Sequence, residues 1–449
     1  MNKLENFPYK NILVLGLAKS GEAAARLLHR SGCMVRINDY QEEGKNPLVH
    51  ELRKEGLEVI TGGHPLTVLS DIELVVKNPG IPYSNSIVKE AIKRKIPVIT
   101  EVDLAGRMIK GSIIGITGSN GKTTTTTLIY KMIEHDHIPV EIAGNIGKTA
   151  SLVASEADPE AVFVVELSSF QLMGIQIFRP HISVWLNLFE AHLDYHGTMD
   201  EYAKAKAKIF KNQTSDDYFV YNADDLSIRQ FLLECKAKVI PFSTTSKQLE
   251  GAWVDDEWIY FRDERVIRLS QVVLVGKHNL ENILAAIASS KLIGVNNESI
   301  VHVLETFGGV EHRLQFVKEL NGRRFYNDSK ATNILATSKA LEAFEQPVIL
   351  LAGGLDRGNS FDSLLPHLNY VKALVVFGQT SEKIKEIGKQ KGITKIIKVD
   401  NVREAAVKAY EISEEGDIIL LSPACASWDQ YRTFEERGDM FMNAVHTLE

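Results

Sequence analysis

Residues 112–129 read SIIGITGSNGKTTTTTLI and decide how the centre of the chain folds. The apolar, β-branched run Ile113–Ile116 predicts a buried strand, and a helix is expected to follow from Lys122. Between them, Gly118 and Gly121 allow a turn whose backbone N–H groups point at one place, beside the positive end of the helix. A strand, a glycine turn and a helix in this order predict a phosphate-binding loop.

The loop is a variant of the common phosphate-binding motif. Ile116 stands where that motif has its first glycine. Lys122 is expected to reach the β- and γ-phosphates of a nucleotide, and the Thr123 hydroxyl is expected to ligate Mg²⁺. A plain glycine turn that caps a helix is the alternative, and strand, glycine, lysine and threonine together favour phosphate binding. The predicted loop residues are Gly118, Ser119, Asn120, Gly121, Lys122, Thr123 and Thr124.

Short apolar runs alternate with amphipathic stretches along the 449 residues, which predicts parallel sheets with crossover helices. The pattern starts three times, so we expect an α/β protein with three domains at residues 1–110, 111–310 and 311–449. Predicted strands lie at residues 11–17, 33–39, 57–61, 73–78, 96–100, 113–116, 161–167, 181–188, 325–329, 347–354, 373–378 and 417–423. A hairpin-like stretch is expected at residues 252–270 and a long helix from His278.

Three further residues follow the loop at places where chemistry is expected. Glu166 ends a predicted strand, His192 follows the next one, and Lys206 lies in a predicted helix. Because the carboxyl ends of parallel strands meet at one edge, Glu166 and His192 are expected to face the phosphate loop and to hold one or two Mg²⁺ ions. The alternatives are a structural or surface role for His192 and a solvated helix face for Lys206, which shares its helix with Lys204, Lys208 and Lys211.

The composition excludes several classes of protein. A net charge of −7 argues against a broad nucleic-acid surface, and the longest apolar runs are too short to span a membrane. Three scattered cysteines are too few for a disulfide framework or a cysteine-based zinc site. We therefore expect a soluble cytoplasmic protein. A monomer is a separate expectation that these features do not decide.

The first strand is followed by a second glycine turn, from Gly16 to Gly21. With Asp39 at the end of the next strand, the turn is similar to a dinucleotide-binding fingerprint, but Ala18 replaces the glycine that lets the backbone approach a pyrophosphate. An NAD-dependent oxidoreductase built on this domain is thus disfavoured. A purely structural strand-to-helix turn is an equal alternative.

A set of motifs in this order resembles the Mur ligase family. The motifs are TGSNGKTT at 117–124, GNIG at 144–147, ELSSFQL at 166–172, HLDYHGTMDEYAKAKAKIF at 192–210, GKHNLENILAA at 276–286, His312-Arg313, NDSKATN at 327–333 and SPACASWDQYRTFEERG at 422–438. Within the family, NDSKATN and SPACASWDQ are similar to the D-glutamate-adding members. The DNPR motif of the diamino-acid-adding relatives is missing from the sequence.

The resemblance implies a Rossmann-like N-terminal domain, a central P-loop ATPase domain with a mostly parallel sheet, and a Rossmann-like C-terminal domain. It implies ATP, UDP-N-acetylmuramoyl-L-alanine and D-glutamate as substrates in peptidoglycan precursor synthesis, with Mg²⁺ as cofactor. It also implies roles for individual residues: Lys122, Glu166, His192 and a carbamylated Lys206 in catalysis; Thr123, Glu166, His192 and Lys206 around the metal; Asn282, Arg313 and Asp328 on ATP; Lys19, Ser20, Asp39, Tyr40, Gly80 and Asn145 on the UDP substrate; Lys330, Thr332, Arg357, Ser427 and Phe434 on D-glutamate.

The implied reaction passes through an acyl phosphate that the D-glutamate amine attacks, with the third domain closing over the second. A ligase of the same family with another amino acid or a folate acceptor is the nearest alternative, and the third-domain motifs disfavour it. A nucleotide-binding regulatory protein without turnover is a further alternative, against which Lys122, Glu166, His192 and Lys206 weigh.

Overall fold

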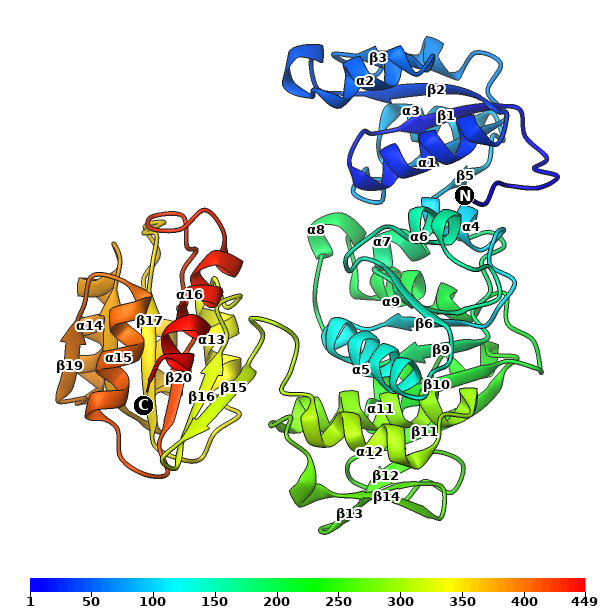
Figure 1. Ribbon diagram of the computed structural model, residues 1–449. Coiled ribbons are helices and arrows are strands. Elements are labelled where there is room, and N and C mark those ends of the chain that lie inside the picture. Colours follow the sequence, from blue (N-terminus) through cyan, green and yellow to red (C-terminus); the bar gives the residue numbers. More distant parts are fainter. Residues whose placement is uncertain (449) are drawn as a thin grey trace. The chain divides into compact units, whose positions relative to one another are not determined.

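A computed structural model describes residues 1–448. The chain forms two compact units, one made of Met1–Ser270 and Glu281–Val303, and the other of Gln271–Leu280 and Leu304 onward. The first unit contains two sheets and the second unit contains one (Figure 1). The predicted class, three α/β modules with mostly parallel sheets, is confirmed.

The first sheet has five parallel strands in the order β3-β2-β1-β4-β5. Along β1 the side chains alternate between two cores: Ile12 and Val14 pack with α1 and α2, whereas Leu13 and Leu15 pack with α3. Helices therefore cover both faces. The elements are β1 (Asn11–Leu15), α1 (Lys19–Arg30), β2 (Met34–Asp39), η1 (Glu43–Lys45), α2 (Leu48–Lys54), β3 (Glu58–Thr61), η2 (Leu66–Leu69), β4 (Leu74–Lys77), α3 (Ser86–Lys93) and β5 (Val98–Ile99).

The second sheet has nine strands in the order β14-β13-β12-β11-β10-β9-β6-β8-β7. Strands β6 to β12 run parallel, and β12 to β14 form the predicted antiparallel hairpins. In chain order the elements are α4 (Glu101–Ala105), β6 (Ile113–Thr117), α5 (Lys122–His135), β7 (Val140–Gly144), α6 (Ala150–Glu156), β8 (Val162–Glu166), α7 (Ser169–Leu172), β9 (Ile182–Trp185), α8 (Leu193–His196), α9 (Met199–Ala207), η3 (Lys208–Phe210), β10 (Tyr218–Asn222), α10 (Leu226–Arg229), η4 (Leu232–Glu234), β11 (Lys238–Ser243), β12 (Ala252–Val254), β13 (Trp258–Phe261), β14 (Glu264–Arg268), η5 (Leu269–Gln271), α11 (Lys277–Ile293) and α12 (Asn297–Thr306).

The third sheet has six strands in the order β15-β16-β20-β17-β18-β19, and all except β15 are parallel. Its faces are covered separately, by α13 and α14 on one side and by α15 and α16 on the other. The elements are β15 (Gln315–Leu320), β16 (Arg323–Asn327), α13 (Ile334–Leu341), β17 (Val348–Gly353), η6 (Asp362–His367), β18 (Val371–Phe377), α14 (Ser381–Lys391), β19 (Lys395–Lys398), α15 (Val402–Ile412), β20 (Ile418–Leu421) and α16 (Phe434–His446). None of the helices within residues 1–448 combines the length and apolar character needed to cross a membrane.

Candidate active site

The predicted phosphate loop connects β6 to α5. Gly121 is the N-cap of α5 and has a left-handed φ of 83°, a conformation that glycine adopts without strain. A Cβ atom at this position would lie 2.1 Å from Oδ1 of Asn282, so any other residue would clash there. The Lys122 amine donates to the carbonyls of Gly118 (2.9 Å) and Ser119 (3.2 Å) and thus lies over the loop.

The loop is held by residues from neighbouring elements. Asn187, just beyond β9, accepts a hydrogen bond from the Asn120 amide (2.9 Å) and donates to the Asn120 carbonyl (3.2 Å). The Ser119 hydroxyl donates to the Phe189 carbonyl at 2.9 Å. Sequence reasoning missed Asn187, although its place at the end of a central strand was a usable signal.

Glu166 lies at the end of β8 and is buried beside the loop. Its Oε2 accepts a hydrogen bond from the Thr123 hydroxyl (2.8 Å), and its Oε1 accepts one from the Asn145 amide (3.0 Å). The contact arises because β6 and β8 are parallel neighbours with Ile116 opposite Glu166. A hydroxyl and a carboxylate next to a phosphate loop are the oxygen ligands that Mg²⁺ uses, usually together with substrate phosphates and water.

Within residues 1–448, there is no group of three or more histidine, cysteine, aspartate or glutamate side chains that could hold a metal ion. The donor set at Thr123 and Glu166 suits a magnesium ion that arrives with a nucleotide.

Lys206 lies on α9 with its side chain 1% exposed. Its amine donates to the Gly118 carbonyl (2.8 Å) and lies 4.7 Å from the centre of the Tyr202 ring. Burial, together with the charge of Lys122, holds the pKa of Lys206 well below the usual value for lysine. Its neighbour Lys204 is exposed and pairs with Asp200 at 2.6 Å, so Lys206 differs from the solvated lysines of the same helix.

His192 precedes α8 as its N-cap residue, with a left-handed φ of 57°, and its side chain is exposed. Its ring lies 5.0 Å from the ring of Phe170 and 6.3 Å from that of Tyr202. His196 is buried instead, and its Nε2 lies 2.9 Å from the Ser169 hydroxyl. Burial lowers the pKa of His196, with the charges of His192 and Lys206 adding to the effect. This environment gives His196 a structural role.

Asn282, on α11, lies beside the loop and accepts a hydrogen bond from the Thr125 hydroxyl at 3.3 Å. The other two residues predicted to contact ATP, Arg313 and Asp328, belong to the second unit. Asp328 follows β16 and is buried, and it accepts hydrogen bonds from the Ser422 hydroxyl (2.7 Å) and the Leu314 amide (3.1 Å). Burial raises the pKa of Asp328 to about 7.

The residues predicted for the uridine nucleotide lie at the carboxyl edge of the first sheet. Asp39 accepts hydrogen bonds from the amides of Leu17 (2.6 Å) and Gln41 (2.8 Å), so its carboxylate also organises the glycine turn. Lys19 and Gly80 are exposed, and the Tyr40 ring is exposed with its centre 5.5 Å from that of His64. The Ser20 hydroxyl accepts a hydrogen bond from the Asn78 amide at 3.0 Å.

In the second unit, a hollow beyond the ends of the strands is lined by Thr332 and Arg357, two residues predicted to bind D-glutamate. The Arg357 guanidinium lies 5.0 Å from the centre of the Trp428 ring, and the Lys330 amine lies 5.0 Å from that of Phe434. The buried Ser427 hydroxyl has no hydrogen-bond partner among the described residues. A buried hydroxyl without a partner suits a polar ligand.

Arg437, on α16, is a residue that sequence reasoning missed. Its side chain is fully buried, and it donates to the carbonyls of Ser329 (2.8 Å) and Cys425 (3.1 Å) and to the Ser329 hydroxyl (3.0 Å). Burial lowers the pKa of Arg437 to about 10. The guanidinium thus joins the NDSKATN and SPACASWDQ segments.

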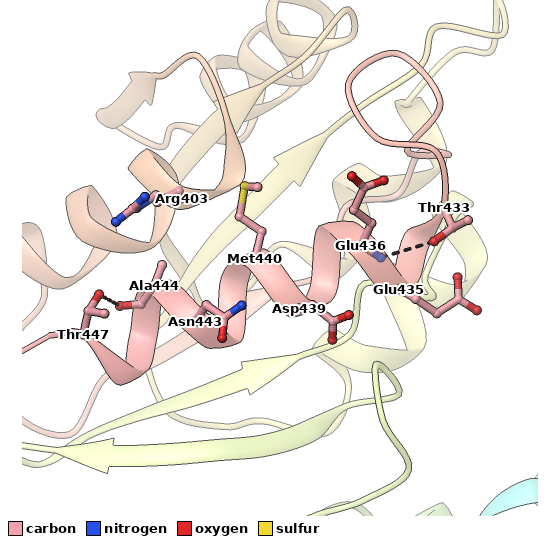
Figure 2. A pocket seen from close by; sticks show the side chains of 9 residues that line it. All are labelled: Arg403, Thr433, Glu435, Glu436, Asp439, Met440, Asn443, Ala444 and Thr447. Atoms are coloured by element: carbon pink, nitrogen blue, oxygen red, sulfur yellow. Dashed lines mark hydrogen bonds between the residues drawn. The ribbon is translucent and has the colours of Figure 1, made fainter.

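A larger hollow lies between α15 and α16. Figure 2 shows the acidic side chains of Glu435, Glu436 and Asp439 along α16, with Arg403 on the facing helix. The Thr433 hydroxyl caps the start of α16 by accepting a hydrogen bond from the Glu436 amide at 3.2 Å. None of the residues that line this hollow is a predicted ligand contact, so it is distinct from the candidate site.

Comparison with known proteins covers nearly the whole chain. Residues 10–100 match the Mur ligase MurD-like N-terminal domain, residues 116–290 the Mur ligase middle domain, and residues 312–425 the Mur ligase glutamate ligase domain. A UDP-N-acetylmuramoylalanine--D-glutamate ligase of Geobacillus kaustophilus is 58% identical over 98% of both chains. A protein of the same name from Bacillus cereus is 55% identical over 100% of both chains.

Solved structures show the same fold at lower identity. A UDP-N-acetylmuramate-alanine ligase of Thermotoga maritima is 19% identical, with a TM-score of 0.57 over 97% of this chain and 99% of that chain. A UDP-N-acetylmuramoyl-L-alanyl-D-glutamate--2,6-diaminopimelate ligase is 18% identical, with a TM-score of 0.59 over 97% of this chain and 92% of that chain. With three matching domains and close relatives along its full length, the chain belongs to the Mur ligase family.

Proposed function

We propose that the protein is an ATP-dependent ligase that joins D-glutamate to the alanyl carboxylate of UDP-N-acetylmuramoyl-L-alanine, in peptidoglycan precursor synthesis. The observation that carries the proposal is the identity of 55–58% over 98–100% of relatives that bear this ligase's name. The arrangement around the phosphate loop supports the ATP-dependent part independently. Because the cysteines of the described chain are all free thiols, a reducing compartment is suitable, and we place the protein in the cytoplasm. We also propose that it is a monomer.

The reaction needs charge stabilisation at the γ-phosphoryl group. Residues Gly118 to Thr124 offer backbone N–H groups to the phosphates, and Lys122 adds a positive charge. The Thr123 hydroxyl and the Glu166 carboxylate, 2.8 Å apart, are placed to hold Mg²⁺. When bound, that ion neutralises charge on the phosphate oxygens. Asn145 orients Glu166 through its 3.0 Å hydrogen bond, and we propose that it also contacts the muramoyl end of the substrate.

Lys206 is proposed to carry a carbamate. A neutral amine adds CO₂ and loses a proton, which changes a cation into an anionic oxygen ligand. The lowered pKa of the buried Lys206 amine supplies the neutral form that this addition requires. Its position beside Gly118 puts the new oxygens next to the phosphate loop, and exposed His192 is proposed to complete this edge of the site.

In the proposed sequence of bonds, a carboxylate oxygen of the alanyl substrate attacks the γ-phosphorus and ADP leaves. The D-glutamate amine then attacks the acyl carbon, inorganic phosphate leaves, and the amine loses a proton. Arg357 and Lys330 provide two cations for the two carboxylates of D-glutamate, Thr332 and Ser427 provide hydroxyls, and Phe434 covers the methylene groups. Asn282, Arg313 and Asp328 contact ATP, and Lys19, Ser20, Asp39, Tyr40 and Gly80 contact the uridine nucleotide.

The test is phosphate release from MgATP in the presence of UDP-N-acetylmuramoyl-L-alanine, with D-glutamate compared against L-glutamate, L-alanine, L-lysine and meso-diaminopimelate. Release that requires both the uridine substrate and D-glutamate supports the proposal. Release with a different amino acid would replace the proposed specificity. An absence of release with every amino acid would refute the proposed nucleotide substrate.

A further inference from the structure

Lys77 is a buried lysine to which the proposed reaction assigns no task. It ends β4, its side chain is 1% exposed, and the other three residues of the strand are buried and apolar. Its amine donates to three backbone carbonyls, those of Ile81 (2.8 Å), Pro79 (3.2 Å) and Asn78 (3.3 Å). An ammonium group has three donors, so these carbonyls can take all of them.

The three carbonyls belong to one turn, residues 78–81, which follows β4 at the carboxyl edge of the first sheet. Within it, the Asn78 side chain accepts a hydrogen bond from the Gly80 amide (3.1 Å) and donates to the Ser20 hydroxyl (3.0 Å). Ser20 and Gly80 are both proposed contacts of the uridine nucleotide. Lys77 thus supports, from the buried side, a turn whose exposed side faces the proposed ligand.

A second element reaches the same carbonyls from the module of the second sheet. The hydroxyl of Tyr195, on α8, lies 2.9 Å from the Ile81 carbonyl, 3.2 Å from the Pro79 carbonyl and 3.4 Å from the Lys77 amine. The Tyr195 ring packs edge-on against Phe170 at 4.6 Å, and Phe170 also contacts the ring of His192. Residues 78–81 are therefore connected, through the side chains of Tyr195 and Phe170, to His192 at the edge proposed for the metal.

The cost of burying the Lys77 amine argues against a role in stabilising the fold only. Burial lowers the pKa of Lys77 to about 7, and no described carboxylate offsets that effect. An apolar side chain of similar length would avoid the cost of burying a charge. What an apolar residue would not supply is three hydrogen bonds that fix the carbonyls of this turn from the buried side.

We propose that Lys77 is a positioning residue for the uridine nucleotide: it fixes residues 78–81 from beneath and, with Tyr195, ties this turn to α8. The inference rests on the proposed function, because it takes the uridine-linked substrate as the ligand of the turn. It adds a residue that touches neither substrate nor metal and acts through the backbone of its neighbours.

The test compares Lys77→Met with Lys93→Met, the same substitution at an exposed lysine of α3 in the same module. Turnover by the unmodified protein is measured first, with KM determined separately for UDP-N-acetylmuramoyl-L-alanine, ATP and D-glutamate. Lys77→Met is expected to raise the KM of the uridine substrate at least tenfold and to change the KM values of ATP and D-glutamate less than twofold. Lys93→Met is expected to change none of them.

Tyr195→Phe removes one hydroxyl and serves as the second variant if Lys77→Met does not fold. It is expected to raise the KM of the uridine substrate two- to fivefold, and the double variant should not exceed Lys77→Met, because both side chains act on the same carbonyls. An unchanged KM for the uridine substrate in the folded variants would overturn the inference. An equal rise in the KM values of all three substrates would also overturn it. Absence of turnover in the unmodified protein would overturn the proposed function and this inference with it.

Discussion

Replacing Gly121 with alanine is predicted to damage ATP binding through a single added carbon atom. Gly121 has a φ of 83°, and the new Cβ would lie 2.1 Å from Oδ1 of Asn282 and 3.2 Å from Cδ1 of Leu186. The Asn282 side chain must then rotate away and lose the hydrogen bond from the Thr125 hydroxyl. Since Asn282 is also a proposed ATP contact, the fold and the site are perturbed together.

The magnitude follows from three contributions. A left-handed conformation costs a residue with a Cβ atom about 1–2 kcal/mol. Moving Asn282 off its preferred rotamer costs about 1 kcal/mol, and the lost hydrogen bond costs about 1 kcal/mol more. The free energy of unfolding should therefore fall by about 3–4 kcal/mol, and ATP affinity should fall at least tenfold, which corresponds to about 1.4 kcal/mol.

Gly294→Ala is the matched control. Gly294 lies in the same unit and has a φ of 97°, but a Cβ atom there would meet nothing within 4 Å. The Gly294→Ala variant therefore measures the backbone contribution to the loss of unfolding free energy by itself, about 1–2 kcal/mol. The assays are the thermal unfolding midpoint and titration with a fluorescent ATP analogue. Equal losses of midpoint in the two variants, with equal ATP affinity, would refute the assigned clash with Asn282.

Three further predictions concern the rest of the site. Lys206→Met should lower kcat at least hundredfold, and the unmodified protein should lose turnover in CO₂-free buffer and regain it with bicarbonate; indifference to CO₂ would contradict the carbamate. The difference in free energy of unfolding between Asp328→Asn and the unmodified protein, measured in urea, should shift in favour of the variant by roughly 2–3 kcal/mol as the pH is raised from 5 to 8. The sign follows because a carboxyl with its pKa raised to about 7 stabilises the fold while protonated and loses that contribution as the pH rises through 7; a difference that stays constant with pH would count against it. Trp428→Ala should raise the KM of D-glutamate about two- to fivefold and spare that of ATP, because it removes the ring against the Arg357 guanidinium; an unaltered KM would exclude this support.

Much of the fold is determined by local sequence. The strand Ile113–Thr117, the glycine loop and the helix from Lys122 lie where the pattern predicts them, because hydrophobic period and glycine conformations are local properties. The strands missed by sequence reasoning were β7, β10, β11, β15 and β19. Several are interrupted by charged residues or proline, such as Glu141 in β7 and Pro241 in β11, so their pairing with neighbours decided their conformation.

The candidate site also has features that the local sequence determined and features that only the tertiary structure decided. The sequence by itself determined the loop residues and the order of the motifs, because a phosphate-binding turn needs a short segment with fixed spacing. Only the tertiary structure decided that Lys206 is buried while Lys204 is exposed, and that Thr123 meets Glu166 across two strands. The burial of Lys77 and Arg437 likewise carries no local signal. A side chain's charge and reactivity depend on the water removed and the partners supplied by distant segments, and those are fixed when the sheets pack.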